Sequence, residues 1–418
     1  MCTFPSVNAS FPATPIMPGR SLPSIRAWRN GVFVIFWLEG FVFASWASRI
    51  PQVRSILDAS TAEMGILLGA IAVGAVSGLL ASSHIIERLG ATRTILIFYV
   101  TAAIGILAAA IVITIAPSFA ALLIALLLFG AGQSIVDVAM NLSGAANERA
   151  LGRTILPLFH AAFSLGTVMG AGLGSLLLLL VVPIGVHLGA VGVIAIGITA
   201  VLVRFLRPAG QEHVEDAGAR RGVRSRLAVW ANSRVLLIGL IVLGMAFAEG
   251  SANDWLSLSM VDGYGVDPAA GAAIFAIFVT ALTLARVAGV KVLDRFGRVA
   301  VLRASAALAA VGLLLVVFGQ ALPIAIAGTV LWGLGAALGF PVGISAAADD
   351  PRTATTAVSA VATIGYCAFL IGPPLIGFVG EHIGLLNALL IVLVLTAIAG
   401  IASGAAKDKA PEAPFPRS

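Results

Sequence analysis

The sequence predicts an all-α membrane protein, in which twelve transmembrane helices form two pseudo-symmetric six-helix bundles. Three observations lead to this prediction. Apolar residues make up 60% of the 418 residues and charged residues only 11%, whereas soluble domains average about 45–50% and about 25%. The apolar residues form long runs, and most Lys and Arg lie in the short segments between the runs. The two halves of the chain also resemble each other.

The apolar runs are long enough to cross a bilayer as helices, which takes about 20 residues. Because they are unbroken rather than short and alternating, they favour helices over a barrel. Pro and Gly lie at several of the junctions, where they would end a helix. The predicted spans are residues 30–49, 63–84, 94–116, 118–143, 156–182, 185–204, 235–258, 268–290, 300–319, 323–346, 354–379 and 385–405.

The distribution of basic residues predicts the orientation. With these spans, 22 of the 25 Lys and Arg fall on one side of the membrane. Arg49 and Arg54 fall on the other side, and Arg286 lies within a span. Basic residues near the ends of spans are enriched on the cytoplasmic side. We therefore predict that both termini are cytoplasmic.

The same pattern divides the chain into two bundles, two tails and a basic linker between the bundles. The linker has two possible interpretations. It is either a flexible basic segment near anionic lipid headgroups or a regulatory docking site. The N-tail has no apolar region of the signal-peptide type, so we expect no cleaved signal. The predicted parts are a cytoplasmic N-tail (1–29), an N-terminal bundle (30–204), a cytoplasmic basic linker (205–234), a C-terminal bundle (235–405) and a cytoplasmic C-tail (406–418).

The two predicted bundles carry similar motifs. Residues 87–90 read Glu-Arg-Leu-Gly after the second span, and residues 294–297 read Asp-Arg-Phe-Gly after the eighth. Trp46 and Trp255 likewise lie near the ends of the first and seventh spans. Two six-helix halves related by an axis normal to the membrane are a recurring layout of transporters.

The acidic-basic-x-Gly motif in these two loops resembles the inter-helix signature of the major facilitator superfamily. The copy at 289–298 matches better, although it has one more residue between Gly and Asp than the commonest form. Segments 44–51, 137–141 and 158–166 are similar to a fucose-permease-related, rhizopine-permease-like bacterial branch of that family. The resemblance implies the major facilitator fold, secondary transport of a solute and a bacterial cytoplasmic (inner) membrane.

The resemblance also implies a gating role for the signature loops. The fifth and eleventh spans begin on the cytoplasmic side, where helix N-termini carry partial positive charge. An acid of a signature loop could dock there when the inner face closes, with the adjacent arginine pairing nearby. The alternative is that these charges only set the topology. The candidate gating residues are Glu87, Arg88, Gly90, Asp294, Arg295 and Gly297.

Acidic residues inside spans are the candidates for proton coupling, because ionisable groups are costly in the membrane and usually functional there. Glu39 and Glu249 lie well inside counterpart spans of the two halves. Each could instead be a neutral acid bonded to a neighbouring helix. Asp254 could be solvated at the outer end, and Arg286 could be paired or snorkelling. The candidate proton-coupling residues are Glu39, Glu249, Asp254 and Asp137.

Polar and aromatic residues on the same helix faces are the candidates for solute binding. Gln133, Asp137 and Asn141 form a stripe with a spacing of four residues, which is one face of a helix. Asp137 and His160 could instead form a structural pair, and the tryptophans could belong to an interfacial belt. The candidate solute-binding residues are Trp46, Gln133, Asn141, His160, Asn253, Trp255 and Tyr366.

Missing motifs narrow the function. The sequence contains no P-loop, no Cys-x-x-Cys and no His-Glu-x-x-His motif, so we expect no enzyme, no cofactor and no metal site. The net charge of +6 comes from short clusters between apolar runs, so we expect no nucleic-acid partner. The expected partners are a small-molecule solute, protons and the lipid bilayer, with the protein a monomer.

Together these observations predict a secondary active transporter of a small polar solute. Tryptophan rings and amide groups favour a sugar or polyol, and the buried acids favour proton symport by alternating access. Two alternatives stay open. The first is proton-coupled efflux of amphipathic compounds, and the second is a membrane receptor or sensor that does not transport.

Overall fold

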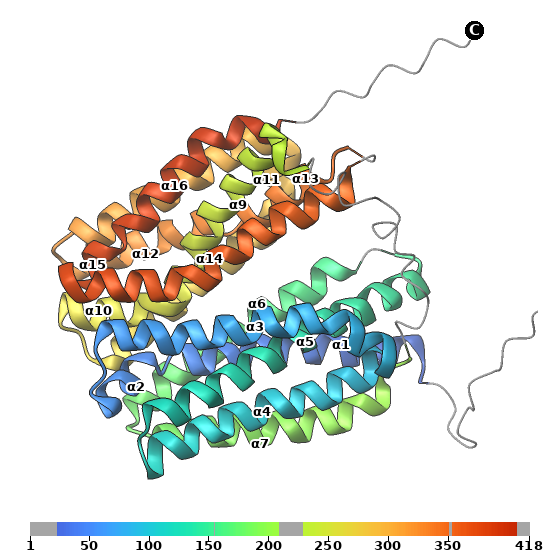
Figure 1. Cartoon of the computed structure of the whole chain (residues 1–418), viewed down its shortest axis with the longest axis horizontal. Helices are drawn as coiled ribbons and strands as arrows, with labels where there is room; N and C mark the ends of the chain where they lie inside the picture. The colour runs from blue at the N-terminus through green and yellow to red at the C-terminus, as the bar shows by residue number, and fades with distance from the viewer. Residues whose placement is uncertain (1–22, 154, 209–228, 351–352, 408–418) are drawn as a thin grey trace, which may run out of the picture.

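The computed structural model of the chain describes residues 23–153, 155–208, 229–350 and 353–407, which are almost entirely helical and contain no strand. Figure 1 shows them as two helical halves. The N-terminal half contains α1 (Ile25–Ala47), α2 (Ile50–Leu57), α3 (Thr61–Leu89), α4 (Ala91–Ile115), α5 (Phe119–Leu151), α6 (Leu156–Leu179) and α7 (Ile184–Leu202). The C-terminal half contains α9 (Ser233–Ser251), η3 (Ala252–Leu256), α10 (Ser257–Tyr264), α11 (Pro268–Phe318), α12 (Leu322–Ala336), α13 (Gly339–Ala347), α14 (Ala354–Ile383), α15 (Leu385–Ala388) and α16 (Leu390–Ala402).

The predicted fold class is confirmed, with one difference in how the spans are divided. Within the described residues, 11 continuous helical segments are long and apolar enough to cross a membrane. One of them, α11, is 51 residues long and loses helical geometry at Gly297. It therefore contains both the eighth and the ninth predicted spans, and the segments accommodate twelve crossings.

The two signature glycines adopt the same backbone conformation. Gly90 has φ 73° and ψ 157° between α3 and α4, and Gly297 has φ 74° and ψ 164° inside α11. A side chain would be strained at this positive φ, whereas glycine adopts it readily. In both halves, glycine thus turns the chain between two consecutive spans.

The helix boundaries differ from the predicted ones where packing extends or interrupts a helix. The fourth span is predicted to end at residue 143, but α5 continues to Leu151. The seventh contains a π-helical turn, η3, between α9 and α10. The tenth is divided into α12 and α13, with Ala337 and Leu338 between them. Most of the predicted linker and tails (1–22, 209–228 and 408–418) lies outside the described residues.

Small residues allow α1 and α6 to pack closely. A Cβ atom at Gly166 would lie 1.9 Å from the carbonyl oxygen of Trp37, and one at Gly170 would lie 2.4 Å from that of Phe41. Both distances are far below van der Waals contact, so only glycine fits. This is the small-residue packing typical of membrane helices.

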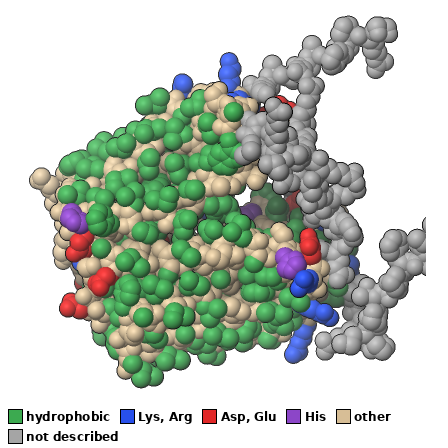
Figure 2. Space-filling view, in the orientation of Figure 1, with side chains coloured by type: hydrophobic (Ala, Val, Ile, Leu, Met, Phe, Trp, Pro, Cys, Tyr) green, Lys and Arg blue, Asp and Glu red, His purple; other side chains and the backbone are tan. Residues whose placement is uncertain are grey.

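The outer surface is apolar, as a lipid-facing surface requires. Leu80, Ile115 and Ile401 are 79%, 77% and 83% exposed, and Figure 2 shows apolar side chains across the visible face of both halves. Soluble monomers rarely expose apolar patches of this extent. The charged side chains in this view gather at the two ends of the helices.

The two halves converge at one end and diverge at the other (Figure 1). The closed end carries α2, α10 and α15, where the two halves meet. The terminal end carries the first and last described residues, 23 and 407, and the ends of α7 and α9 that flank the linker. Figure 2 shows a hollow between the halves on this face, with a histidine inside it.

Candidate functional site

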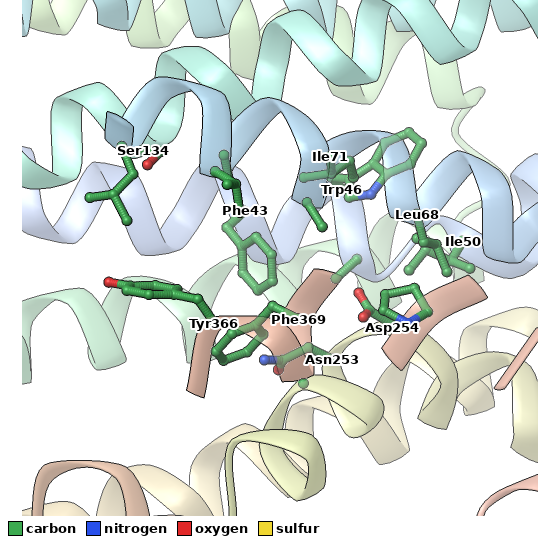
Figure 3. Close-up of a pocket in the computed structure, with 17 residues that line it drawn as sticks. Phe43, Trp46, Ile50, Leu68, Ile71, Ser134, Asn253, Asp254, Tyr366 and Phe369 are labelled. Atoms are coloured by element: carbon green, nitrogen blue, oxygen red, sulfur yellow. The ribbon is translucent and has the colours of Figure 1, made fainter. Parts of the chain in front are cut away.

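Two cavities lie between the halves, one on each side of α1 and the α9–η3 segment. The first, here called the aromatic cavity, has a volume of about 240 Å³ and is shown in Figure 3. The N-terminal half contributes α1, α2, α3 and α5 to its wall, and the C-terminal half contributes α9, η3 and α14. Its lining includes Phe43, Trp46, Ile71, Ser134, Asn253, Asp254, Tyr366 and Phe369.

The second cavity, here called the polar cavity, has a volume of about 190 Å³. It lies between α1 and α6 of one half and α9, η3 and α11 of the other. Phe43 and Asn253 line both cavities, so these two side chains separate them. The polar lining consists of Ser164, Thr167, Glu249, Asn253, Thr283 and Arg286.

The π-helical turn η3 positions the polar residues of the seventh span. It covers Ala252–Leu256 and widens the helix by one residue, a distortion that is frequent at functional sites. Asn253 and Asp254 line the aromatic cavity, whereas Trp255 is fully buried and lines neither cavity. The distortion thus turns two adjacent polar side chains towards the space between the halves.

In the N-terminal half, the buried Glu39 and the exposed Asp137 are each bonded to an amide. Glu39 is 4% exposed, and the Gln133 side chain, with its amide nitrogen facing the carboxylate, donates to it at 2.8 Å. The Asn141 amide donates to Oδ1 of Asp137 at 3.2 Å and to its carbonyl oxygen at 2.8 Å. Asp137 is close enough to Glu39 to repel it electrostatically. Within the described residues, neither acid has a cationic partner.

In the C-terminal half, by contrast, the acid of the seventh span is paired with a cation. The Arg286 guanidinium donates to both carboxylate oxygens of Glu249, at 2.7 and 2.8 Å. It also donates to the carbonyl oxygen of Ala337 at 3.3 Å. The Arg286 side chain is 32% exposed and the Glu249 side chain 19% exposed, and both line the polar cavity. Arg286 is therefore a paired cation inside the protein, not one that snorkels to the membrane surface.

Of the seven predicted solute-binding residues, Trp255 lines neither cavity, and the other six separate into three groups. Trp46, Asn253 and Tyr366 line the aromatic cavity. Gln133 and Asn141 are bonded to the acids beside it. The exposed His160 ring packs edge-on against Phe36, with the ring centroids 5.2 Å apart.

The tryptophans are inside the protein. Trp46, Trp255 and Trp332 are each at most 1% exposed, so none of them lies in an interfacial belt. The Nε1 of Trp332 donates to the carbonyl oxygen of Ala248 at 3.0 Å. The Nε1 atoms of Trp46 and Trp255 are buried and have no hydrogen-bond partner among the described residues.

The predicted gating acids are exposed and form no latch in this conformation. Within the described residues, Glu87 and Asp294 make no hydrogen bond or ion pair, and Arg295 lies over the Phe296 ring at 5.3 Å. The N-terminus of α6 is instead occupied by Glu148, which accepts from the backbone nitrogens of Ile155 and Leu156 at 2.6 and 2.7 Å. A latch by Glu87 at that helix would have to displace this carboxylate.

A second cluster at the terminal end ties the C-terminal half together. Arg234 donates to Oδ2 of Asp349 at 2.9 Å, and Arg298 of the signature donates to Oδ1 at 2.6 Å. Burial alone would raise the pKa of Asp349, but the hydrogen bonds and charges of both arginines hold the pKa below its ordinary value. The carboxylate therefore stays ionised and links the starts of two spans to the end of the tenth.

At the closed end, charged groups join the two halves directly. Arg54 of α2 forms an ion pair with Asp262 of α10. Glu381 of α14 accepts from the backbone nitrogens of Thr61 and Ala62, at 2.7 and 3.2 Å. A carboxylate at the first turn of a helix is favoured by the helix dipole. We call these three side chains and two backbone nitrogens the outer latch.

Arg49 is a fully buried cation just inside the outer latch. Its Nε donates to Nδ1 of His187 at 2.9 Å, and its Nη1 donates to Gln52 and to the carbonyl oxygen of Val182 at 2.8 and 3.2 Å. These contacts join the break between α1 and α2 to the start of α7. They hold the closed end of the N-terminal half together.

Sequence reasoning missed the outer latch and much of the aromatic wall. Asp262 and Glu381 lie in short polar segments that look like ordinary loops, and Phe43 and Phe369 lie in apolar runs. One signal pointed to the latch. Arg54 is one of two basic residues on its side of the membrane, and such a residue often has a specific partner.

Comparisons with known proteins agree with this architecture. The sequence profile of the Major Facilitator Superfamily matches residues 32–258 and 251–418. The chain is 32% identical to the transporter y4wD of Sinorhizobium fredii over 381 residues, which cover 88% of this chain and 97% of that protein. It is 27% identical to the membrane protein MosC of Rhizobium meliloti over 373 residues, which cover 88% and 87%.

Solved structures show the same fold. The nucleoside transporter NupG superposes with a TM-score of 0.71 at 17% identity, covering 91% of this chain and 98% of NupG. The E. coli fucose:proton symporter FucP superposes with a TM-score of 0.63 at 16% identity, covering 92% and 100%. The profile match, the relatives and the twelve-span fold establish that the chain belongs to the Major Facilitator Superfamily and is a multi-pass membrane transporter rather than an enzyme.

Proposed function

We propose that this protein is a proton-coupled secondary transporter that moves a small polar solute of the sugar or polyol class by alternating access. The observation that carries the proposal is the pair of cavities between the halves, lined by polar groups from both. A site shared by two rigid halves can be exposed to one side of the membrane and then to the other when the halves rock.

The charge pattern supports a bacterial inner membrane with the terminal end in the cytoplasm. Basic residues of the predicted cytoplasmic side, such as Arg88, Arg234 and Arg298, lie at the terminal end, whereas Arg54 lies at the closed end. With this orientation the outer latch is periplasmic. The conformation described here is then inward-facing, because the halves meet at the periplasmic end.

We assign proton binding to Glu39 and Asp137. An ionised carboxylate in a low-dielectric interior is costly unless a cation pairs with it. Glu39 is bonded to an uncharged amide, and its charged neighbour Asp137 is of the same sign. When the cavity closes around them, at least one proton on this pair removes the repulsion. Glu249 already has its counter-charge in Arg286.

The cavity lining supports a small polyhydroxylated solute. Asn253, Tyr366 and Ser134 offer donors and acceptors to hydroxyl groups, and Trp46 and Phe43 offer flat faces to ring carbons. The volume of about 240 Å³ is below the roughly 300–1,000 Å³ of pockets for drug-sized ligands. The size thus favours a molecule of one ring.

Transport by purified protein tests the proposal. The chain would be reconstituted into proteoliposomes, and uptake of radiolabelled fucose and myo-inositol would be measured with and without an imposed pH gradient. We expect accumulation above the external concentration only when the outside is acidic. A protonophore should abolish accumulation and leave counterflow intact. Accumulation that is equal with and without the gradient would refute proton coupling.

One observation favours a second function, the proton-coupled efflux of amphipathic compounds. Most of the aromatic cavity wall is apolar, with Ile71, Leu68 and Phe369 among the lining residues. Such a wall suits an apolar solute as well as a sugar ring. Cells that express the protein should then resist amphipathic dyes, and no sugar should exchange in proteoliposomes.

A further inference from the structure

Tyr99 of α4 carries a buried hydroxyl group that lacks a partner. The residue is 1% exposed, and its hydroxyl oxygen makes no hydrogen bond within the described residues. Burial of a polar group without a hydrogen bond is destabilising, and such groups are rare in native proteins. Because α4 lines neither of the two cavities, this hydroxyl does not belong to the solute site.

Close packing of α4 against α5 places this hydroxyl beside the proposed proton site. A Cβ atom at Gly132 of α5 would lie 2.8 Å from the carbonyl oxygen of Phe98 of α4, so the two backbones nearly touch. Tyr99 and Gln133 follow these two residues in the chain and therefore belong to the same crossing. The Gln133 amide is bonded to Glu39, and the Tyr99 hydroxyl lies close enough to the Glu39 carboxyl group to interact with it.

Two titratable side chains act on Glu39, and they are Tyr99 and Asp137. The helices α6 and α7, which also pack against α1, each carry a histidine. His160 of α6 lies against an aromatic ring of α1, and His187 of α7 accepts from a guanidinium at the closed end. Within the described residues, neither histidine is bonded to Glu39. Asp137 thus repels the ionised carboxylate, and the Tyr99 hydroxyl is available to stabilise it.

In the proposed cycle, Glu39 is ionised for part of the time and has no cation to balance it. The Arg286 guanidinium is bonded to Glu249 instead. The carboxylate therefore depends on neutral donors, and a hydrogen bond to an ion is stronger than one to a neutral group. Gln133 supplies the first donor. A tyrosine hydroxyl can donate, so Tyr99 can supply the second.

We propose that Tyr99 is a positioning residue of the proton site, whose hydroxyl donates to the Glu39 carboxylate once the proton has left and thereby permits proton release inside the protein. The inference rests on the proposed proton binding by Glu39 and adds a residue of α4 to that site. The bond is absent in the conformation described here and forms when Glu39 is ionised. Without the hydroxyl, Glu39 should hold its proton more tightly.

Infrared difference spectroscopy would measure the protonation of Glu39 without any solute. The full-length protein in detergent would be titrated, and the carboxylic-acid band that is missing from Glu39→Gln would be assigned to Glu39. In Tyr99→Phe we expect the midpoint of this band to move to a higher pH by about one unit, which is a tenfold change in proton affinity. The reason is that the ionised form loses a stronger bond than the protonated form does.

Tyr264→Phe is the matched control. It also removes one tyrosine hydroxyl, but that hydroxyl belongs to the C-terminal half and donates to the carbonyl oxygen of Val316 at 2.6 Å. The midpoint of the Glu39 band should be unchanged in this control. The melting temperature should show the reverse order, because Tyr264→Phe breaks a hydrogen bond and Tyr99→Phe removes a hydroxyl that has none in this conformation.

Transport supplies a second readout of the same residue. Accumulation of radiolabelled fucose or myo-inositol under a pH gradient should be slower in Tyr99→Phe proteoliposomes, because the proton is released less readily to the inside. Raising the internal pH by about one unit should restore the wild-type rate. Exchange at equal pH should stay within about twofold of wild type, since α4 lines neither cavity.

The outcomes separate the inference from the proposed function. An unchanged midpoint in Tyr99→Phe, a shift to lower pH, or an equal shift in Tyr264→Phe overturns the inference and leaves proton coupling by Glu39 standing. A shifted midpoint in a protein that never accumulates solute under a pH gradient refutes the coupling and keeps the contact between Tyr99 and Glu39. If no infrared band depends on Glu39 at any pH, both proposals are wrong.

Discussion

The first and seventh spans occupy equivalent places in the two halves but neutralise their acids in different ways. Glu39 is bonded to the Gln133 amide and lies near a second acid, whereas Glu249 is held by the Arg286 guanidinium. A carboxylate bonded to a guanidinium is stable as an ion. One that lacks a cation must be protonated, or solvated, to be stable in the interior. Equivalent acids in a repeated fold therefore need not share a role.

The largest effect on stability is expected from breaking the ion pair between Arg286 and Glu249 in the C-terminal half. Arg286→Ala would leave Glu249 without a counter-charge in the polar cavity. Loss of one partner of a buried pair costs about 3–5 kcal/mol, and partial exposure of both side chains reduces this. We expect a clear fall in the melting temperature, measured by fluorescence-detected size exclusion.

A second substitution tests whether the lost pairing is the cause. Adding Glu249→Gln to Arg286→Ala should recover most of the stability, because no unpaired charge remains. Arg295→Ala, at an exposed signature position, should have no effect. Equal stability of Arg286→Ala and wild type would show that the pair is dispensable, and the comparison between the halves would lose its basis.

Substitution of Glu39 and of Glu249 should affect proton-coupled transport in different ways. Glu39→Gln keeps a side chain of the same shape beside Gln133 but cannot carry a proton in and out. We expect it to abolish accumulation driven by a pH gradient while leaving exchange at equal pH within about threefold of wild type. Glu249→Gln should reduce exchange as well, because it frees Arg286. If Glu39→Gln still accumulates solute under a pH gradient alone, Glu39 is not the coupling residue.

The outer latch offers a test of alternating access that does not depend on the solute. Asp262→Asn combined with Glu381→Gln removes the charge of both latch acids and weakens contacts between the halves. Each loss is worth about 0.5–1.5 kcal/mol, so outward-facing molecules should become roughly ten times more frequent.

Labelling from outside the cell would detect that shift. Ser134→Cys places a thiol on the aromatic cavity wall, in a background where Cys2 and Cys367 are replaced by serine. An impermeant maleimide should label it faster in the latch variant than with the latch intact. Equal labelling rates would mean that the latch acids do not hold the periplasmic end closed.

The smallest expected effect on stability comes from the terminal end, where Asp349 is bonded to two partly exposed arginines. The pKa of Asp349 is held below its ordinary value, so its bonds to Arg234 and Arg298 stabilise the folded state above the unfolded pKa of about 3.9. This contribution is lost as pH falls through the folded pKa. Because the partners are partly exposed, about 1 kcal/mol or less is expected.

The measurement is the difference in melting temperature between wild type and Asp349→Asn as a function of pH. The wild type should be more stable at pH 6, and the difference should shrink below pH 4 (about the ordinary aspartate pKa). A difference that stays constant down to pH 3 would contradict the assigned role of the carboxylate.

Much of the candidate site could be predicted from the sequence, because ionisable residues within apolar runs are rare and conspicuous. Glu39, Asp137, Glu249 and Asp254 were recognisable in this way, and Trp46, Asn253 and Tyr366 by their helix faces. Their partners were not. The sequence predicts Gln133 as a solute-binding residue, and only the structure shows that its amide is bonded to Glu39. Helical periodicity predicts which face a residue shares within its own helix, but not which helix lies opposite.

The membrane class, the number of spans and the family signature follow from the amino-acid sequence alone. Those features follow from apolar run length and from glycines such as Gly90 and Gly297, whose positive φ no other residue adopts easily. Tertiary structure alone decided that Arg54 meets Asp262 across 208 residues of chain and that the π-turn directs Asp254 into an aromatic cavity. The physical reason is that these contacts depend on how the two halves meet, and the local sequence does not specify which residues of one half lie opposite those of the other.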